Sequence, residues 1–171
     1  NIDSDHLDTY EGDFQNLKNN FLEFLHRLPF YGLAVLCVDD EGVNSILPDL
    51  SRPNVTYGIT EKADYRATNI RHDKAKSFFS VSKAGQENWL EIELNMPGNH
   101  NVRNALAAIA IADELDVDKQ SISNALSKFA GIDRRCDVLG EIEISGKRVL
   151  LIDDYAHHPV EIAAIISSVR K

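Results

Sequence analysis

The sequence predicts an α/β fold, in which a doubly wound sheet carries a small antiparallel ribbon and is followed by the opening strand and helix of a Rossmann-like unit. Apolar runs at residues 33–38 and 149–152 alternate with segments of helical periodicity, which is typical of strands and helices that alternate in α/β domains. Residues 54–95 differ, because short segments rich in β-branched and aromatic residues predict antiparallel strands. In the last of these, Leu90, Ile92 and Leu94 alternate with polar residues, which predicts one buried face.

The composition excludes several classes of protein. The 171 residues, 43% of them hydrophobic, are enough to bury a core. No apolar run approaches the roughly 20 residues of a membrane span, and a net charge of −9 argues against a broad nucleic-acid-binding surface. Cys37 and Cys136 have no paired spacing, so we expect a reducing compartment and a cytoplasmic protein. The first residues lack a Met and a signal peptide, so we expect an internal piece of a longer chain.

The predicted elements follow in order. Apolar residues at helical spacing predict a helix at 13–28, which Pro29 ends. A strand at 33–38, a short helix at 44–47 and the ribbon at 54–95 come next. Pro97-Gly98 precedes a helix at 100–115, and Asp118 is expected to cap a second one. A strand pair at 138–144 and 148–152 leads to a helix that Pro159 begins.

A cluster of polar side chains follows the apolar run 149–152, which we expect to be a strand buried on both faces of a parallel sheet. Its members are Asp153, Asp154, Tyr155, His157 and His158. The cluster thus lies at the carboxyl end of a strand and before a helix, where open α/β sheets bind ligands. A solvated turn with a capping aspartate would explain one acid, but the whole cluster favours a site.

Three further groups are candidates, each with a structural alternative. The acid-rich segment 3–8 contains His6. Its carboxylate oxygens are the ligand type that Mg²⁺ prefers, and the structural alternative is an exposed acidic terminus. Asn101 and Asn104, which follow His100, present paired amides to a purine edge, or act as helix caps. Arg134 and Arg135 clamp phosphate oxygens, or form a solvated corner. His72, in a polar turn, is expected to be exposed and without a role.

Taken together, five motifs resemble the Mur ligase family over essentially the whole chain. They are Asn-Ile-Asp-x-Asp-His-x-Asp from Asn1, Leu-Pro-Phe-Tyr-Gly from Leu28, Pro-Gly-x-His-Asn-x-x-Asn-Ala from Pro97, Gly-x-x-Arg-Arg-x-Asp from Gly131 and Asp-Asp-Tyr-Ala-His-His-Pro from Asp153. The motifs are most similar to those of the member that joins L-alanine to UDP-N-acetylmuramate. The resemblance implies the second half of a P-loop-type central ATPase domain at residues 1–132 and the beginning of the Rossmann-like C-terminal domain at 133–171.

The resemblance also implies an activity and site residues. ATP phosphorylates the carboxylate of UDP-N-acetylmuramate, and the amine of L-alanine attacks the acyl phosphate, in a step of peptidoglycan synthesis for the cell wall. By this resemblance His6 is a magnesium ligand, and Arg135 reaches the phosphates as a catalytic and nucleotide-binding residue. The other implied nucleotide-binding residues are His100, Asn101, Asn104 and Asp154. Tyr155, His157 and His158 face the amino-acid and acyl substrates, with both histidines catalytic.

The sequence departs from the family pattern in one major respect and leaves alternatives open. Asp3, Cys136 and Ala156 are mild departures, but no Gly-x-x-Gly-Lys-Thr-like loop occurs, so we expect the triphosphate cradle upstream of Asn1. A related ligase that attaches a preformed peptide to UDP-N-acetylmuramate is the nearest alternative. The acids and histidines of 3–8 and 153–158 also fit a two-metal hydrolase, and a non-catalytic nucleotide-binding module is a third possibility.

Overall fold

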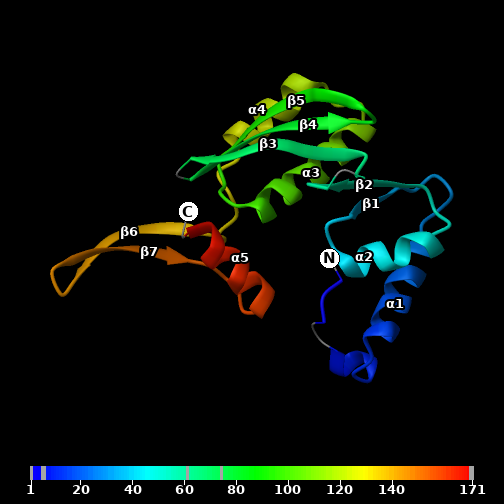
Figure 1. Cartoon of the computed structure of the whole chain (residues 1–171), viewed down its shortest axis with the longest axis horizontal. Coiled ribbons are helices and arrows are strands. Elements are labelled where there is room, and N and C mark those ends of the chain that lie inside the picture. The colour runs from blue at the N-terminus through cyan, green and yellow to red at the C-terminus, as the bar shows by residue number, and fades with distance from the viewer. Residues whose placement is uncertain (1, 5–6, 61, 74, 170–171) are drawn as a thin grey trace.

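The computed structural model describes residues 2–4, 7–60, 62–73 and 75–169, and its main feature is one five-stranded sheet (Figure 1). The strands are ordered β1 to β5 across the sheet. Their bounds are β1 (Ala34–Cys37), β2 (Asn54–Gly58), β3 (Tyr65–Asp73), β4 (Lys76–Lys83) and β5 (Gln86–Leu94). The pairs β1–β2 and β2–β3 are parallel, whereas β3–β4 and β4–β5 are antiparallel. The predicted α/β fold with an antiparallel ribbon is therefore confirmed, and the ribbon continues the parallel part.

Helices cover both faces of this sheet near β1. Two 3₁₀ helices, η1 (Leu7–Tyr10) and η2 (Leu47–Asp49), accompany four α helices, α1 (Phe14–His26), α2 (Glu41–Ile46), α3 (Asn99–Glu114) and α4 (Lys119–Lys128). Val35 packs into the core beneath α3, whereas its neighbour Leu36 packs against the α1–α2 cluster. Successive residues of a strand point to opposite faces, so these two neighbours serve two cores.

The larger core forms between α3 and the strands. Val102, Leu106 and Ile109 of α3 are fully buried, as is Val81 of β4. Their spacing on α3 is the apolar stripe of a helix that packs on a sheet. The smaller core is formed by Ile2, Leu17, Val43 and Ile46.

Aspartates fix where three of the helices begin. The Asp13 carboxylate accepts a hydrogen bond from Gln15 N at 2.7 Å, Asp40 from Val43 N at 2.8 Å and Asp118 from Ser121 N at 3.0 Å. Each satisfies a backbone N–H that has no partner within its helix. The cap expected at Asp118 is confirmed.

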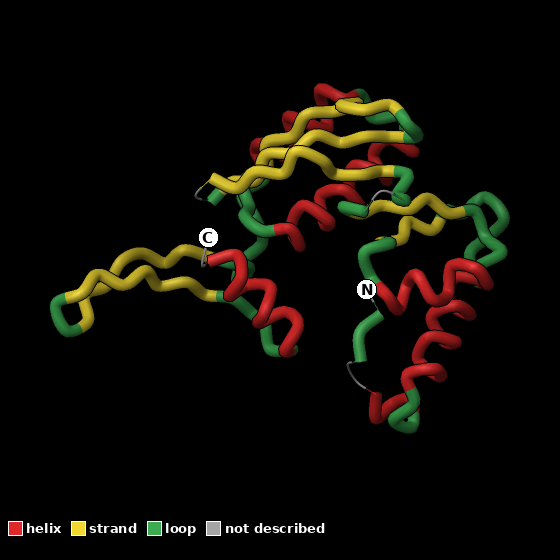
Figure 2. The backbone as a smooth tube through the Cα atoms, in the orientation of Figure 1, coloured by secondary structure: helices red, strands yellow, loops and turns green. Residues whose placement is uncertain are grey.

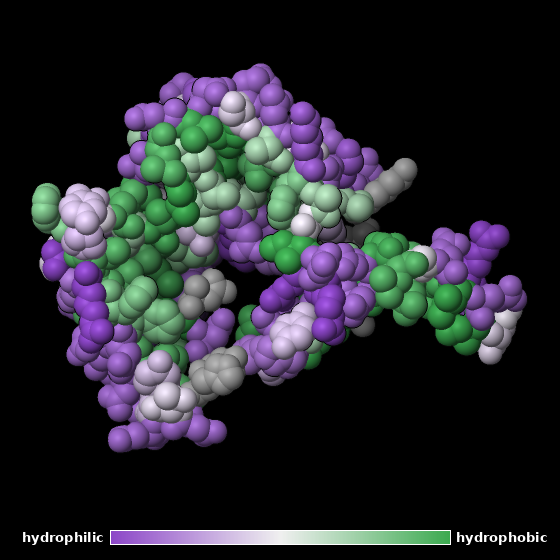
Figure 3. Space-filling model, turned by 180° about the vertical axis from the view of Figure 1, so that it is seen from behind, coloured by the Kyte–Doolittle hydropathy of each residue, from purple (hydrophilic) through white to green (hydrophobic). Residues whose placement is uncertain are grey.

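The C-terminal residues form a separate hairpin and helix. Strands β6 (Asp137–Ile144) and β7 (Lys147–Asp153) pair antiparallel and project from the rest of the chain, and α5 (Pro159–Val169) folds back toward α3 (Figure 2). The expectation that 149–152 is buried on both faces is wrong in this structure, because Leu150 and Leu151 are 50% and 43% exposed. Among the described residues, β6 is the one strand that pairs with β7. Apolar side chains therefore line the surface of the hairpin (Figure 3).

Within the described ranges, no helix combines the length and the apolar character needed to cross a bilayer.

Candidate functional site

A cavity of about 840 Å³ lies between α3, α4 and α5. Its wall on the α3 side includes Ala105 and Ala108, whose small side chains leave room beside the helix. Leu126 of α4 and Phe129, which directly follows α4, contribute an apolar wall, and Val160 and Ile165 contribute another from α5. An apolar cavity with a few polar groups is the usual form of a site for a small molecule or nucleotide.

Five of the residues predicted from sequence line this one cavity. Three of them, His100, Asn101 and Asn104, come from the first two turns of α3. Arg135 precedes β6, and Asp154 directly follows β7. The structure therefore brings together residues from the two predicted domains, 1–132 and 133–171.

The two asparagines of α3 have different environments. Asn101 is 6% exposed, and its Nδ2 donates to the carbonyl oxygen of Pro97 at 2.8 Å. This bond fixes the turn that leads into α3. Asn104 is exposed on the side of the helix that lines the cavity. Asn104 therefore offers its whole amide to a ligand, whereas Nδ2 of Asn101 is engaged with Pro97. Both asparagines line the cavity, and their predicted nucleotide-binding roles remain predictions.

His100 is half-buried among charged groups. Burial lowers the pKa of its imidazole, Asp154 opposes this shift, and the positive charges of Arg103 and Arg135 add to it. These effects favour the neutral ring, which has one nitrogen as donor and the other as acceptor. A neutral His100 is better suited to form a hydrogen bond with a base or a sugar than to form an ion pair.

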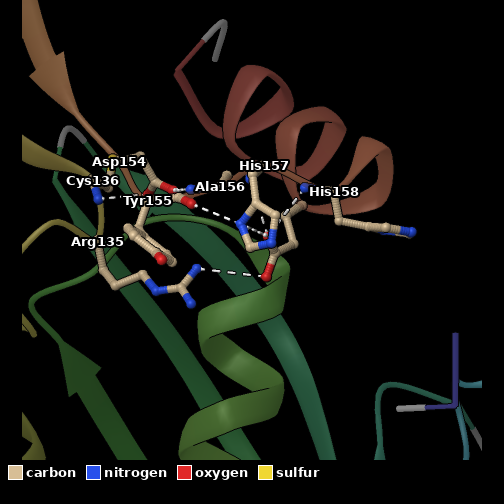
Figure 4. A network of polar contacts seen from close by, with 8 residues as sticks. Arg135, Cys136, Asp154, Tyr155, Ala156, His157 and His158 are labelled. Carbon is tan, nitrogen blue, oxygen red and sulfur yellow. Dashed lines mark hydrogen bonds and ion pairs between the residues drawn. The ribbon is translucent and has the colours of Figure 1, made fainter. Parts of the chain in front are cut away.

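Asp154 is held in a fixed orientation by two backbone groups (Figure 4). One carboxylate oxygen accepts from Cys136 N at 2.8 Å, and the other accepts from Ala156 N at 2.7 Å. These bonds tie the loop after β7 to the segment before β6. Each oxygen keeps a second lone pair, so the carboxylate can accept further hydrogen bonds from a ligand.

Glu161, in the first turn of α5, is a site residue that the sequence analysis missed. Its carboxylate accepts from the backbone N–H groups of His157 and His158 at 3.3 and 3.5 Å, and lies 3.8 Å from Nη1 of Arg135. The hydrogen bond from His157 N is the main cause of the lowered pKa of Glu161. The sequence does contain a signal for this residue. A Glu two residues after a Pro that begins a helix commonly reaches back to cap that helix.

The other residues of the 153–158 cluster lie outside the lining of this cavity. The Arg134 guanidinium stacks on the ring of Tyr155 at 5.1 Å, and that ring meets His157 edge to face at 5.5 Å. His157 Nδ1 lies 3.2 Å from the carbonyl oxygen of Tyr155, so Nδ1 carries the proton in this contact. In Figure 4 the His158 side chain extends away from this group. The predicted roles of Tyr155, His157 and His158 therefore remain predictions.

The predicted metal ligand, His6, lies outside the described residues. Asp3 lines the cavity and also borders a second pocket near α2. In that pocket Oδ1 of Asp40 accepts hydrogen bonds from both Ile2 N and Val43 N. In the part of the chain that the structure describes, no three His, Cys, Asp or Glu side chains are close enough to hold a metal ion.

His72 makes hydrogen bonds with both ring nitrogens, although it was expected from the sequence to be exposed and without a role. Its Nδ1 lies 3.0 Å from Ser77 Oγ and its Nε2 lies 2.9 Å from Asn99 Oδ1. Ser77 in turn donates to the carbonyl oxygen of Met96 at 2.6 Å. The end of the ribbon is thereby tied to the turn before α3, from which His100 and Asn104 reach the cavity.

Comparison with known proteins identifies relatives of this architecture. The family model described as the Mur ligase middle domain matches residues 1–112. The UDP-N-acetylmuramate-alanine ligase MurC from Thermotoga maritima is 30% identical, with a TM-score of 0.76 over 97% of this chain and 36% of that one. MurF from Acinetobacter baumannii is 25% identical, with a TM-score of 0.77 over 96% and 34%.

A third relative joins a larger group to the same sugar nucleotide. It is the UDP-N-acetylmuramate:L-alanyl-gamma-D-glutamyl-meso-diaminopimelate ligase from Neisseria meningitides, 26% identical, with a TM-score of 0.60 over 71% of this chain and 36% of that one. The chain thus spans little more than a third of the length of each of these solved structures.

Proposed function

This chain belongs to the Mur ligase family, and we propose that it forms part of an ATP-dependent ligase that joins L-alanine to UDP-N-acetylmuramate in peptidoglycan synthesis. The match of the middle-domain model to residues 1–112 supports the ligase class. The arrangement of His100, Asn104 and Asp154 around one cavity is the observation that carries the proposal. The similarity to the alanine ligase of Thermotoga maritima supports the choice of amino acid.

In this proposal the cavity holds the nucleotide. His100 and Asn104 contact the base and ribose, and Asp154 accepts hydrogen bonds from the ribose hydroxyls. Arg135 binds phosphate oxygens, for which the planar guanidinium is well suited. Asn101 supports this site through its bond to Pro97, which sets the start of α3.

The reaction would proceed in two steps. The muramate carboxylate attacks the γ-phosphorus of ATP and releases ADP, and the amine of L-alanine then displaces phosphate from the acyl phosphate through a tetrahedral intermediate. Arg135 would stabilise the phosphate charge in both steps. Tyr155, His157 and His158 would contact the acyl and amino-acid substrates. Because they lie outside the cavity lining, we propose that closure of the C-terminal unit brings them to the reacting groups.

The residues near the N-terminus fit a magnesium ion by the chemistry of their donors. Carboxylate oxygens are the ligands that Mg²⁺ prefers, and Asp3 places one at the cavity. We propose that His6 and Asp3 hold Mg²⁺, which would screen the phosphate charge.

The division into domains at 132 and 133 is part of the proposal. The buried hydrophobic residues of the core lie at or before Ile122. Strands β6 and β7 form their own sheet, which is not hydrogen-bonded to the five-stranded one among the described residues. Residues 133–171 therefore suit the beginning of a second domain.

A peptide-adding ligase is the second candidate, since the relative from Neisseria meningitides joins a peptide to UDP-N-acetylmuramate. Membership of the family does not favour the hydrolase alternative. The test uses the native protein that carries this sequence, with UDP-N-acetylmuramate, ATP and either L-alanine or a tripeptide. We expect L-alanine to stimulate ADP release. Stimulation by the tripeptide alone would select the second candidate, and substrate hydrolysis without ATP would contradict both.

A further inference from the structure

Arg103 lines the same cavity, although no sequence motif singled it out. It lies on α3, three residues after His100 and directly before Asn104. Its Nε donates to Oδ2 of Asp39 at 2.6 Å, and its side chain is 38% exposed. The guanidinium is therefore anchored on one edge and accessible on another.

The anchor of Arg103 is itself held firmly. The Asp39 side chain is 8% exposed and follows β1, and its oxygens accept from Ile59 N at 3.0 Å and Thr60 N at 3.2 Å. A Cβ at Gly58 would lie 2.8 Å from Asp39 Oδ1, so the absence of a side chain there lets the carboxylate approach β2. Asp39 thus joins the carboxyl ends of β1 and β2 to α3 and fixes the direction of the arginine.

The bond to Asp39 uses one of the five N–H groups of the guanidinium. Among the contacts of the described residues, Nε is the atom of Arg103 that makes a hydrogen bond or ion pair. The described residues therefore leave four N–H groups on the two Nη atoms open to a ligand in the cavity. A half-exposed, oriented guanidinium with free donors is well suited to bind an oxyanion.

The charge around the cavity is consistent with an anionic ligand. Arg103 and Arg135 both lower the pKa of His100, which places both guanidinium charges near the same imidazole. Arg103 comes from α3, whereas Arg135 comes from the segment before β6. Both residues line the cavity, so an anion bound in it would interact with two positive charges.

We propose that Arg103 binds a phosphate oxygen of the nucleotide through its Nη groups, in the cavity that Arg135 also lines. This proposal rests on the proposed function, because it takes the ligand to be ATP. In the alternative, Arg103 serves only as the counter-ion of Asp39 and stabilises the fold. The two roles predict different effects of replacing Arg103. Loss of a phosphate contact would weaken the binding of ATP and ADP but not that of adenosine, which has no phosphate.

The test compares phosphorylated and unphosphorylated ligands in the native ligase. The variants are Arg103→Leu, which removes the charge, and Arg103→Lys, which keeps a charge near Asp39 without the planar fork. Arg66→Leu is the matched control, since Arg66 is paired with Glu87 at 4.0 Å and does not line the cavity. The measurements are KM for ATP, the inhibition constants of ADP and adenosine, and Tm.

We expect Arg103→Leu to raise KM for ATP and the inhibition constant of ADP about 10-fold or more, as for loss of a charge-assisted hydrogen bond. Adenosine inhibition should change less than about twofold, and Arg103→Lys should be intermediate. Equal weakening of ADP and adenosine, or a lower Tm with unchanged ADP binding, would overturn the proposal. A wild-type protein without ATP-dependent ligation would contradict the proposed function itself, which is a distinct result.

Discussion

Ser168 of α5 lies directly against Gly98, the residue that precedes α3. A Cβ on Gly98 would lie 2.3 Å from Ser168 Oγ and 2.9 Å from Cε1 of His100. The φ angle of Gly98 is +93°, a conformation that L residues rarely adopt. This contact joins the C-terminal helix to the start of the helix that carries His100 and Asn104, so it sets one wall of the cavity against another.

A methyl group at residue 98 should separate the two helices. We expect Gly98→Ala to lower the free energy of unfolding by about 1–3 kcal/mol from backbone strain and to speed amide exchange in α5 because the clash displaces it. Urea unfolding and hydrogen exchange measure the two effects. Gly85→Ala is the matched control, since Gly85 has φ +82° and nothing within 4 Å of its Cβ position. Equal effects of both variants on α5 would show that the contact with Ser168 is unimportant.

Asn104 should matter for nucleotide binding and not for folding. Its side chain is exposed and faces the cavity, so Asn104→Ala should remove one or two hydrogen bonds to the ligand. In the native ligase we expect KM for ATP to rise by a factor that corresponds to about 1–3 kcal/mol, with Tm nearly unchanged. Asn124→Ala, in α4 and outside the cavity lining, is the control. A large drop in Tm with an unchanged KM would assign Asn104 a structural role.

Much of the site could be predicted from sequence because its residues stand in local patterns. His100, Asn101 and Asn104 share the start of one helix, and Asp154 follows a strand, so periodicity and strand ends located them before the structure did. The five residues that the family resemblance assigns to the nucleotide line one cavity, and their binding roles remain predictions.

Pairs that are distant in sequence could not be predicted in this way. Arg103 and Asp39 are 64 residues apart and lie in no common motif. His72 was expected to be exposed without a role, yet it contacts Asn99, which lies 27 residues further along at the start of α3. The apolar run 149–152 resembled a buried strand, but burial depends on the elements that cover a strand, and its own residues do not specify them. In all three cases the environment of the residue depends on tertiary contacts, which local sequence patterns do not specify.

A polar cluster at the far end of α3 should stabilise the domain without contributing to the site. Tyr65 is 1% exposed, and its hydroxyl donates to Asp113, which also pairs with Lys83. Asp113→Ala would leave that hydroxyl buried without its acceptor, so we expect a loss of about 1–3 kcal/mol in the free energy of unfolding. The same loss should be smaller in a Tyr65→Phe background, which a double-mutant cycle by urea unfolding measures. Additive effects would mean that the hydrogen bond contributes little.

His100 should make stability depend on pH in a window set by its own titration. Its pKa in the folded protein is lowered, chiefly by burial, from an ordinary value near 6.5. Below about pH 6.5 the unfolded chain therefore binds a proton that the folded chain resists, so stability should fall as the pH decreases toward the lowered folded value. Above pH 7 both states hold the neutral ring, and the contribution is constant.

The measurement is urea unfolding between about pH 5.5 and 7.5 at fixed salt, a range in which ordinary carboxylates remain ionised. We expect the wild-type chain to lose stability across this range and His100→Gln to lose less, since it has no imidazole to protonate. His157→Gln is the control, because it replaces an exposed histidine outside the cavity lining. If His100→Gln kept the full pH dependence of the wild type, or if His157→Gln removed it, the lowered pKa of His100 would not be its source.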